Sequence, residues 1–181
     1  RILAPYFGSS VHVWGSIITV FMLSLSLGYL FGGRLSLANA SLHRYGVIFL
    51  CAGVTLMPIA YFATPILELV FDVIDDSRYG SLLASMALFF IPTIILGMIS
   101  PYSVRLLVTN ENESGHVAGL LYFVSTLGSA LGTIGTSFYF VLWFEVNTLI
   151  ISYCSLLVVL GLAAIFINRM ELSDDAVAVQ L

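Results

Sequence analysis

The chain contains no lysine, and its six arginines and ten acidic residues leave a net charge of −4 over 181 residues. Because nucleic-acid binding requires a basic face for the phosphates, this function is excluded. Charged residues make up only 9% of the chain, against about 25% in soluble domains. So few polar side chains cannot cover the surface of a soluble domain of this size.

Motifs for catalysis and metal binding are also missing. The two cysteines, Cys51 and Cys154, lie inside apolar stretches without metal-ligand spacing. The chain has no HExxH motif, no GxSxG motif and no Gly-rich nucleotide loop. We therefore expect no catalytic residue, no cofactor and no metal site, and no enzyme activity from this chain alone.

What the sequence does contain is five long stretches without any charged residue: 2–33, 45–67, 79–104, 114–144 and 146–168. A helix needs about 20 apolar residues to span the hydrocarbon core, and each stretch is long enough. The sequence thus predicts an all-α, polytopic transmembrane bundle with helices over 11–33, 45–67, 80–100, 117–144 and 147–167. Residues 1–10 would form an interfacial segment, 11–168 the membrane domain and 169–181 an acidic cytoplasmic tail.

The arginines set the expected orientation. Arg34, Arg44, Arg105 and Arg169 fall on one side of the predicted membrane and Arg78 on the other. By the positive-inside rule, the C-terminus is cytoplasmic. Five helices would then leave the N-terminus outside, so we expect a sixth helix before Arg1, which would complete a half-major-facilitator-like bundle.

Two helices carry glycines four residues apart, which suit close helix packing: Gly28 and Gly32, and Gly128 and Gly132. With a preceding helix, these two helices would be the second and fifth of six, which are equivalent positions in a 3+3 repeat. The alternative is coincidence, because glycine is common in membrane helices.

Four acids recur about one helical turn apart between the second and third predicted helices: Glu68, Asp72, Asp75 and Asp76. As a helix, this segment would lie on the membrane surface with its acids toward water. It would either attract a cation or polyamine, or form a simple solvated face.

A second candidate site combines polar and aromatic residues suited to the interface: Tyr6, His12, Trp14 and Arg105. Pro5 and Gly8 should break any helix in the first segment, and irregular backbone at membrane depth must be buried or line a cavity. Alternatively, Arg105 simply extends to the headgroups and the histidine is an interfacial polar tip.

Several segments together resemble the membrane region of bacterial spermidine-synthase-like integral membrane proteins, the fused major-facilitator/spermidine-synthase family. They are LAPYFGSS followed by a tryptophan, GGRL, SPYSVRL and STLGS, within residues 1–136. The resemblance implies the bacterial inner membrane and a helix before LAPYFGSS. In many members a soluble aminopropyltransferase-like domain follows. Here only MELSDDAVAVQL follows Arg169, so no residue of that domain can be carried over.

Three functional hypotheses follow. The first is a non-catalytic subunit or anchor of a membrane complex, with a homo-oligomer, a larger complex or a soluble aminopropyltransferase-like protein as partner. The second is a transporter half for polyamines or another small solute, which a cavity lined by Ser and Thr between helices 11–33 and 117–144 would favour. The third is the membrane part of an aminopropyltransferase. No charge lies mid-helix, which weakens ion-coupled transport.

Overall fold

The computed structural model describes residues 2–38, 40–108 and 114–178, with side chains up to residue 170. Within these residues the chain forms helices and no strand. Five segments are long and apolar enough to cross a membrane: Val11–Leu37, Leu42–Val73, Ser77–Leu107, Ser114–Trp143 and Val146–Met170. The predicted all-α fold with five membrane-spanning helices is therefore confirmed.

Four long helices extend beyond the predicted limits, because the helix continues past the charged residues at the end of the apolar region. They are α2 (Val11–Leu37), α3 (Leu42–Val73), α4 (Ser77–Leu107) and α7 (Val146–Ala178). The fifth, α5 (Ser114–Gly135), begins earlier than predicted but ends before the predicted limit at residue 144. The side chain of Ser41 caps α3 by accepting from the Arg44 amide, and Asp76 caps α4 by accepting from the Arg78 amide. Four prolines lie inside α3 and α4 without ending either helix.

The first segment differs from the prediction. Residues Ala4–Phe7 form a short helix, α1, although Pro5 and Gly8 were expected to prevent one. Proline is tolerated in the first turn, where its missing N–H would have no helical partner. Gly8 then ends the helix with φ 77°, a conformation that glycine adopts without steric cost.

The predicted surface helix is also wrong. Glu68 and Asp72 lie in the last turns of α3, whereas Asp75 and Asp76 lie in the short turn that leads directly into α4. Because α3 remains continuous to Val73, Glu68 and Asp72 belong to the end of a membrane-spanning helix and not to a separate surface helix.

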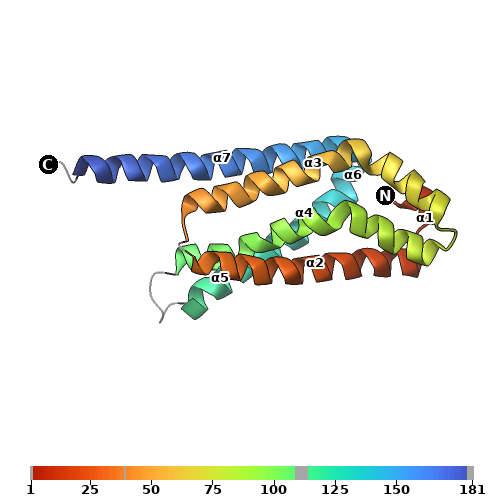
Figure 1. The fold of residues 1–181 in the computed structure, drawn as a ribbon, viewed down its shortest axis with the longest axis horizontal. Helices are drawn as coiled ribbons and strands as arrows, with labels where there is room; N and C mark the ends of the chain where they lie inside the picture. Colours follow the sequence, from red (N-terminus) through yellow and green to blue (C-terminus); the bar gives the residue numbers. More distant parts are fainter. Residues whose placement is uncertain (1, 39, 109–113, 179–181) are drawn as a thin grey trace.

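Helix pairing defines the bundle, as Figure 1 shows: α2 lies beside α4, and α3 lies beside α7 and also contacts α4. The α2 residues buried against the bundle include a run of mostly small side chains four apart: Val20, Ser24, Gly28, Gly32 and Ser36. Small residues let two backbones approach closely. The fourth span, in contrast, contacts the rest of the bundle only lightly through α4.

The fourth span also changes its winding. After α5, residues Thr136–Phe140 form a π-helical turn, η2, and Val141–Trp143 form α6. Such turns are rare and are often found at functional sites. Here Thr136, Phe140 and Val141 line one cavity together with residues of the N-terminal segment.

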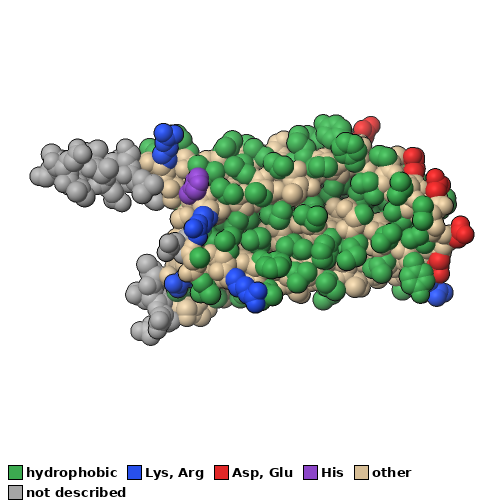
Figure 2. All heavy atoms as spheres, viewed as in Figure 1, with side chains coloured by type: hydrophobic (Ala, Val, Ile, Leu, Met, Phe, Trp, Pro, Cys, Tyr) green, Lys and Arg blue, Asp and Glu red, His purple; other side chains and the backbone are tan. Residues whose placement is uncertain are grey.

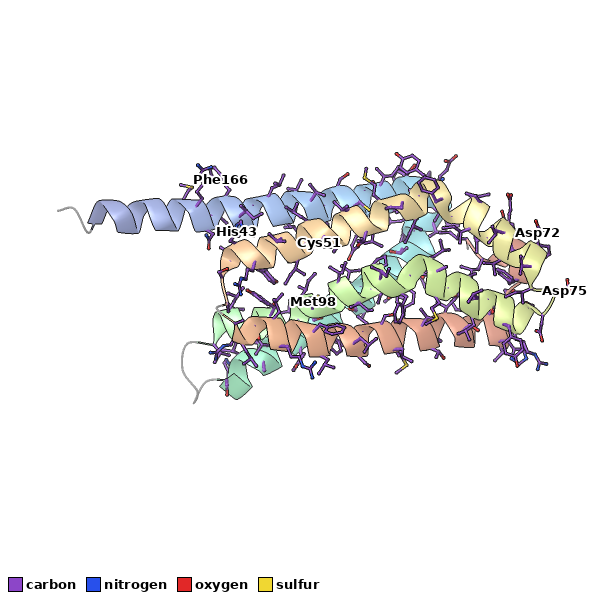
Figure 3. All side chains as sticks on the ribbon, viewed as in Figure 1. His43, Cys51, Asp72, Asp75, Met98 and Phe166 are labelled. Atoms are coloured by element: carbon purple, nitrogen blue, oxygen red, sulfur yellow. The ribbon has the colours of Figure 1, made fainter. Side chains whose placement is uncertain are left out.

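Charges gather at the two ends of the bundle, as Figure 2 shows. We call the end with Arg34, Arg44, Arg105 and Arg169 the basic end. The acidic end carries Glu68, Asp72, Asp75 and Asp76 at the end of α3 and in the turn that follows, together with Arg78 at the start of α4. Figure 3 labels His43 near the first end and Asp72 and Asp75 at the second. The surface between them is mostly apolar, as expected of a protein that spans a membrane.

Candidate functional site

The predicted polar site is divided between the two ends of the molecule. Tyr6 lies in α1, and His12 and Trp14 lie in the first turns of α2, at the acidic end. Arg105 lies in the last turn of α4. Because α1 packs against the first turns of α4, the length of that helix separates Arg105 from the other three residues.

The fold instead joins Tyr6 to one residue of the acidic segment. The Tyr6 hydroxyl donates a long hydrogen bond of 3.5 Å to Glu68 Oε1. Partial burial raises the pKa of the Tyr6 phenol, and the neighbouring Glu68 carboxylate raises it further. In this contact the phenol is the hydrogen-bond donor and the Glu68 carboxylate is the acceptor.

The four acids follow one another along the acidic end and do not converge on one point. Asp76 uses its carboxylate as the helix cap described above, whereas Asp75 is exposed in the turn. Among the described residues, no three His, Cys, Asp or Glu side chains lie close enough together to hold a metal ion. These acids give the end its charge, and the structure assigns them no common ligand.

The two glycine pairs have different surroundings. A Cβ atom on Gly28 would lie 2.8 Å from the Gly97 Cα, and one on Gly32 would lie 2.6 Å from the Met98 Cα. These glycines thus pack within the chain, against α4. At Gly128 and Gly132 an added Cβ would meet nothing within 4 Å, so this face of α5 is open.

A third close approach was missed from the sequence. A Cβ atom on Gly46 would lie 2.6 Å from the carbonyl oxygen of Gly161. This contact joins α3 to α7. Neither Gly46 nor Gly161 has a second glycine four residues away. The glycine spacing that predicts close helix packing is therefore absent from both helices.

A large apolar cavity near the acidic end was not predicted. It has a volume of about 710 Å³ between the N-terminal segment, α2, the η2–α6 turn and α7. Its walls are mainly apolar, with Trp14, Phe21, Phe89 and Phe140 among them. Such walls suit an apolar group and offer little that could orient a polar one.

A smaller cleft between α2, α4 and α5 is chemically different. Its volume is about 420 Å³, and the residues that line it are Tyr29, Ser100, Pro101, Tyr122, Ser125, Thr126 and Ser129. Six of these seven side chains carry a hydroxyl group. Within the described part of the chain, none of the six hydroxyls has a hydrogen-bond partner in the structure.

This hydroxyl cleft was also missed, although part of its signal was present. Ser125, Thr126 and Ser129 belong to the STLGS segment, and Ser129 follows the other two at helical spacings of four and three residues. What the sequence could not supply is the partner wall, Tyr29 and Ser100, which other helices contribute.

Comparison of the chain with protein-family models, with curated proteins and with solved structures finds no match.

Proposed function

We propose that this chain is a non-catalytic subunit of a membrane complex, and that it assembles through α5 with a second copy of itself. The motif resemblance described above supports a place in the bacterial inner membrane beside the spermidine-synthase-like membrane proteins. The observation that carries the proposal is the exposure of α5: none of its residues is buried, and Gly128 and Gly132 lie open.

The chemistry of this exposed face favours protein over lipid. An apolar helix face is satisfied by lipid, but glycine leaves polar backbone uncovered and offers lipid chains little contact. Association of membrane helices depends on close packing at small residues, since burial of apolar surface adds little there. The open glycines of α5 therefore suit another helix better than they suit acyl chains.

A second copy is the partner that fits this pattern best. Two identical Gly128-xxx-Gly132 faces are complementary to each other, and two-fold pairing of one surface with itself is the commonest way in which chains assemble. Pairing would also leave the charged ends of both copies at the membrane surfaces.

The test is the oligomeric state of the full chain with α5 altered. We expect the wild type to run as a dimer in mild detergent by native mass spectrometry. The double variant Gly128→Ile, Gly132→Ile should run as a monomer, because the added side chains separate the helices. The matched control is Gly15→Ile, Gly33→Ile, two open glycines of α2, which should remain dimeric.

Two outcomes would count against the proposal. A wild type that runs alone with nothing attached removes the subunit function. A different bound protein that is lost with Gly128→Ile, Gly132→Ile keeps the subunit function but removes the second copy as the partner.

The arginine distribution supports one orientation of this subunit. Of the arginines in the described residues, four lie at the basic end and Arg78 lies at the other. Cytoplasmic loops carry the excess of arginine. We therefore infer that the basic end and the C-terminus face the cytoplasm.

Solute handling is the second candidate function, and the hydroxyl cleft favours it. Its walls include residues of α2 and α5. These helices correspond to the predicted helices 11–33 and 117–144, and a cavity lined by Ser and Thr between them was expected to favour transport. Because no charged side chain lines the cleft, it suits an uncharged solute better than a polyamine.

A further inference from the structure

The hydroxyl groups of the cleft differ in their bonding from seven other hydroxyl groups in the spans. Elsewhere in the spans, seven Ser and Thr side chains donate to the carbonyl oxygen four residues earlier: Ser24, Ser26, Thr55, Ser103, Thr133, Ser152 and Ser155. This bond satisfies a hydroxyl inside a membrane. Ser100, Ser125, Thr126 and Ser129 make no such bond in the described residues.

The cleft hydroxyls are accessible to a bound group. Ser125, Thr126 and Ser129 are exposed, and Ser100 is half-buried. Three helices together bring six hydroxyl groups to this one cleft. Hydroxyls that make no bond to their own helix are free to bond a ligand there.

The lining of the cleft limits what that group can be. It contains no charged side chain, so neither a cation nor an anion would find a counter-charge there. A hydroxyl both donates and accepts, which matches a ligand whose own groups also do both. The volume of about 420 Å³ lies within the range of small-molecule sites.

The depth of the cleft indicates where the ligand comes from. Pro101 precedes Arg105 by one helical turn, about 6 Å, and both belong to α4. Tyr29 precedes Arg34 on α2 by five residues, about 7.5 Å. The cleft therefore lies just inside the basic end, within reach of both water and lipid headgroups.

We propose that the hydroxyl cleft binds an uncharged polyhydroxyl group, either a free polyol or the glycerol headgroup of a lipid. Ser125, Thr126 and Ser129 of α5 hydrogen-bond one side of this group, and Ser100 bonds the other. Tyr29 and Tyr122 border it with rings that combine an apolar face with a polar tip. The cleft is formed within one chain, so this inference does not rest on the proposed dimer.

Two binding measurements on the purified full chain test the proposal and separate the two sources. Equilibrium dialysis with radiolabelled sorbitol measures the free polyol. Native mass spectrometry from nanodiscs compares retention of phosphatidylglycerol with that of phosphatidylserine, which has the same net charge but no diol headgroup. We expect saturable sorbitol binding, preferential retention of phosphatidylglycerol, or both.

The decisive comparison is between two triple variants. Ser125→Ala, Thr126→Val, Ser129→Ala removes three hydroxyls of the cleft and should weaken the observed binding at least about tenfold, because three hydrogen bonds are lost. Ser26→Ala, Thr133→Val, Ser155→Ala removes three hydroxyls that bond to their own helices and should leave binding unchanged.

Sorbitol binding alone identifies a free polyol as the source, and phosphatidylglycerol selectivity alone identifies a lipid. The proposal is overturned if neither probe binds above the phosphatidylserine background, or if both triple variants bind as the wild type does. Equal loss in both variants overturns it as well, since that loss would reflect general damage to the bundle.

Discussion

At Gly28 the α2 backbone lies directly against α4. An added Cβ would meet the carbonyl oxygen of Ile94 and come within 2.8 Å of the Gly97 Cα. These atoms belong to a helix backbone, which cannot move aside as the end of a flexible side chain could. One missing methyl group therefore sets how closely these two helices approach.

Gly28→Ala should lower the free energy of unfolding by about 1–3 kcal/mol, the usual cost of overpacking. The control is Gly33→Ala on the same helix, where an added Cβ meets nothing within 4 Å. That change should be neutral or stabilise the helix slightly, because alanine favours helix more than glycine does. Denaturant unfolding in detergent micelles measures both, and equal stabilities would contradict the packing described here.

At the scale of elements, α1 closes the acidic end although it is only four residues long. Phe7 is 5% exposed and contacts Gly80 at the start of α4. The backbone carbonyl of Phe7 accepts a 2.9 Å hydrogen bond from the Ser77 hydroxyl. The buried Phe7 side chain and this hydrogen bond join the short helix to α4, whereas Tyr6 joins it to α3 through the long hydrogen bond to Glu68.

Phe7→Ala should release α1, because truncating a buried aromatic side chain costs about 3–5 kcal/mol. The expected readout is faster amide hydrogen exchange over residues 4–14, with exchange in α7 unchanged. Tyr6→Phe serves as the control, since it removes only the long 3.5 Å hydrogen bond to Glu68. Unchanged exchange over these residues in Phe7→Ala would show that Phe7 does not hold the helix.

On the scale of the whole molecule, the dominant property is the apolar surface between two charged ends and the unequal share of arginines at them. The apolar surface between them matches the bilayer core, and the charged ends match its two interfaces. The arginine excess at the basic end then distinguishes the two possible orientations. No single helix carries this information, because α2, α3, α4 and α7 each contribute one arginine to the basic end.

The proposed orientation predicts how cysteines at the two ends react in intact cells. In a Cys51→Ala, Cys154→Ala background, Asp75→Cys should react with a membrane-impermeant thiol reagent added outside. Ala38→Cys should react only after the cells are permeabilised. Both positions are exposed, so the labelling of each after permeabilisation is the internal control. The reverse pattern would place the basic end outside.

The sequence by itself determined that this protein has an apolar, membrane-spanning surface, that it is helical and that it has five spans. These properties depend on how many apolar residues stand together and on how long a stretch runs without a charge. Both can be read from a window of about 20 residues of sequence. It also indicated the charged ends, because the arginines and acids stand in the short connections. Even there, the limits of α1 and the continuation of α3 through Asp72 needed the structure.

Only the tertiary structure decided how the helices use their faces. Gly28 and Gly128 have the same spacing to their partner glycines, yet the first packs against α4 and the second lies open. Tyr29, Ser100 and Ser129 meet across three helices, although 71 and 29 residues separate them in turn. Spacing along one helix defines a face, whereas what that face meets depends on contacts between helices distant in the sequence.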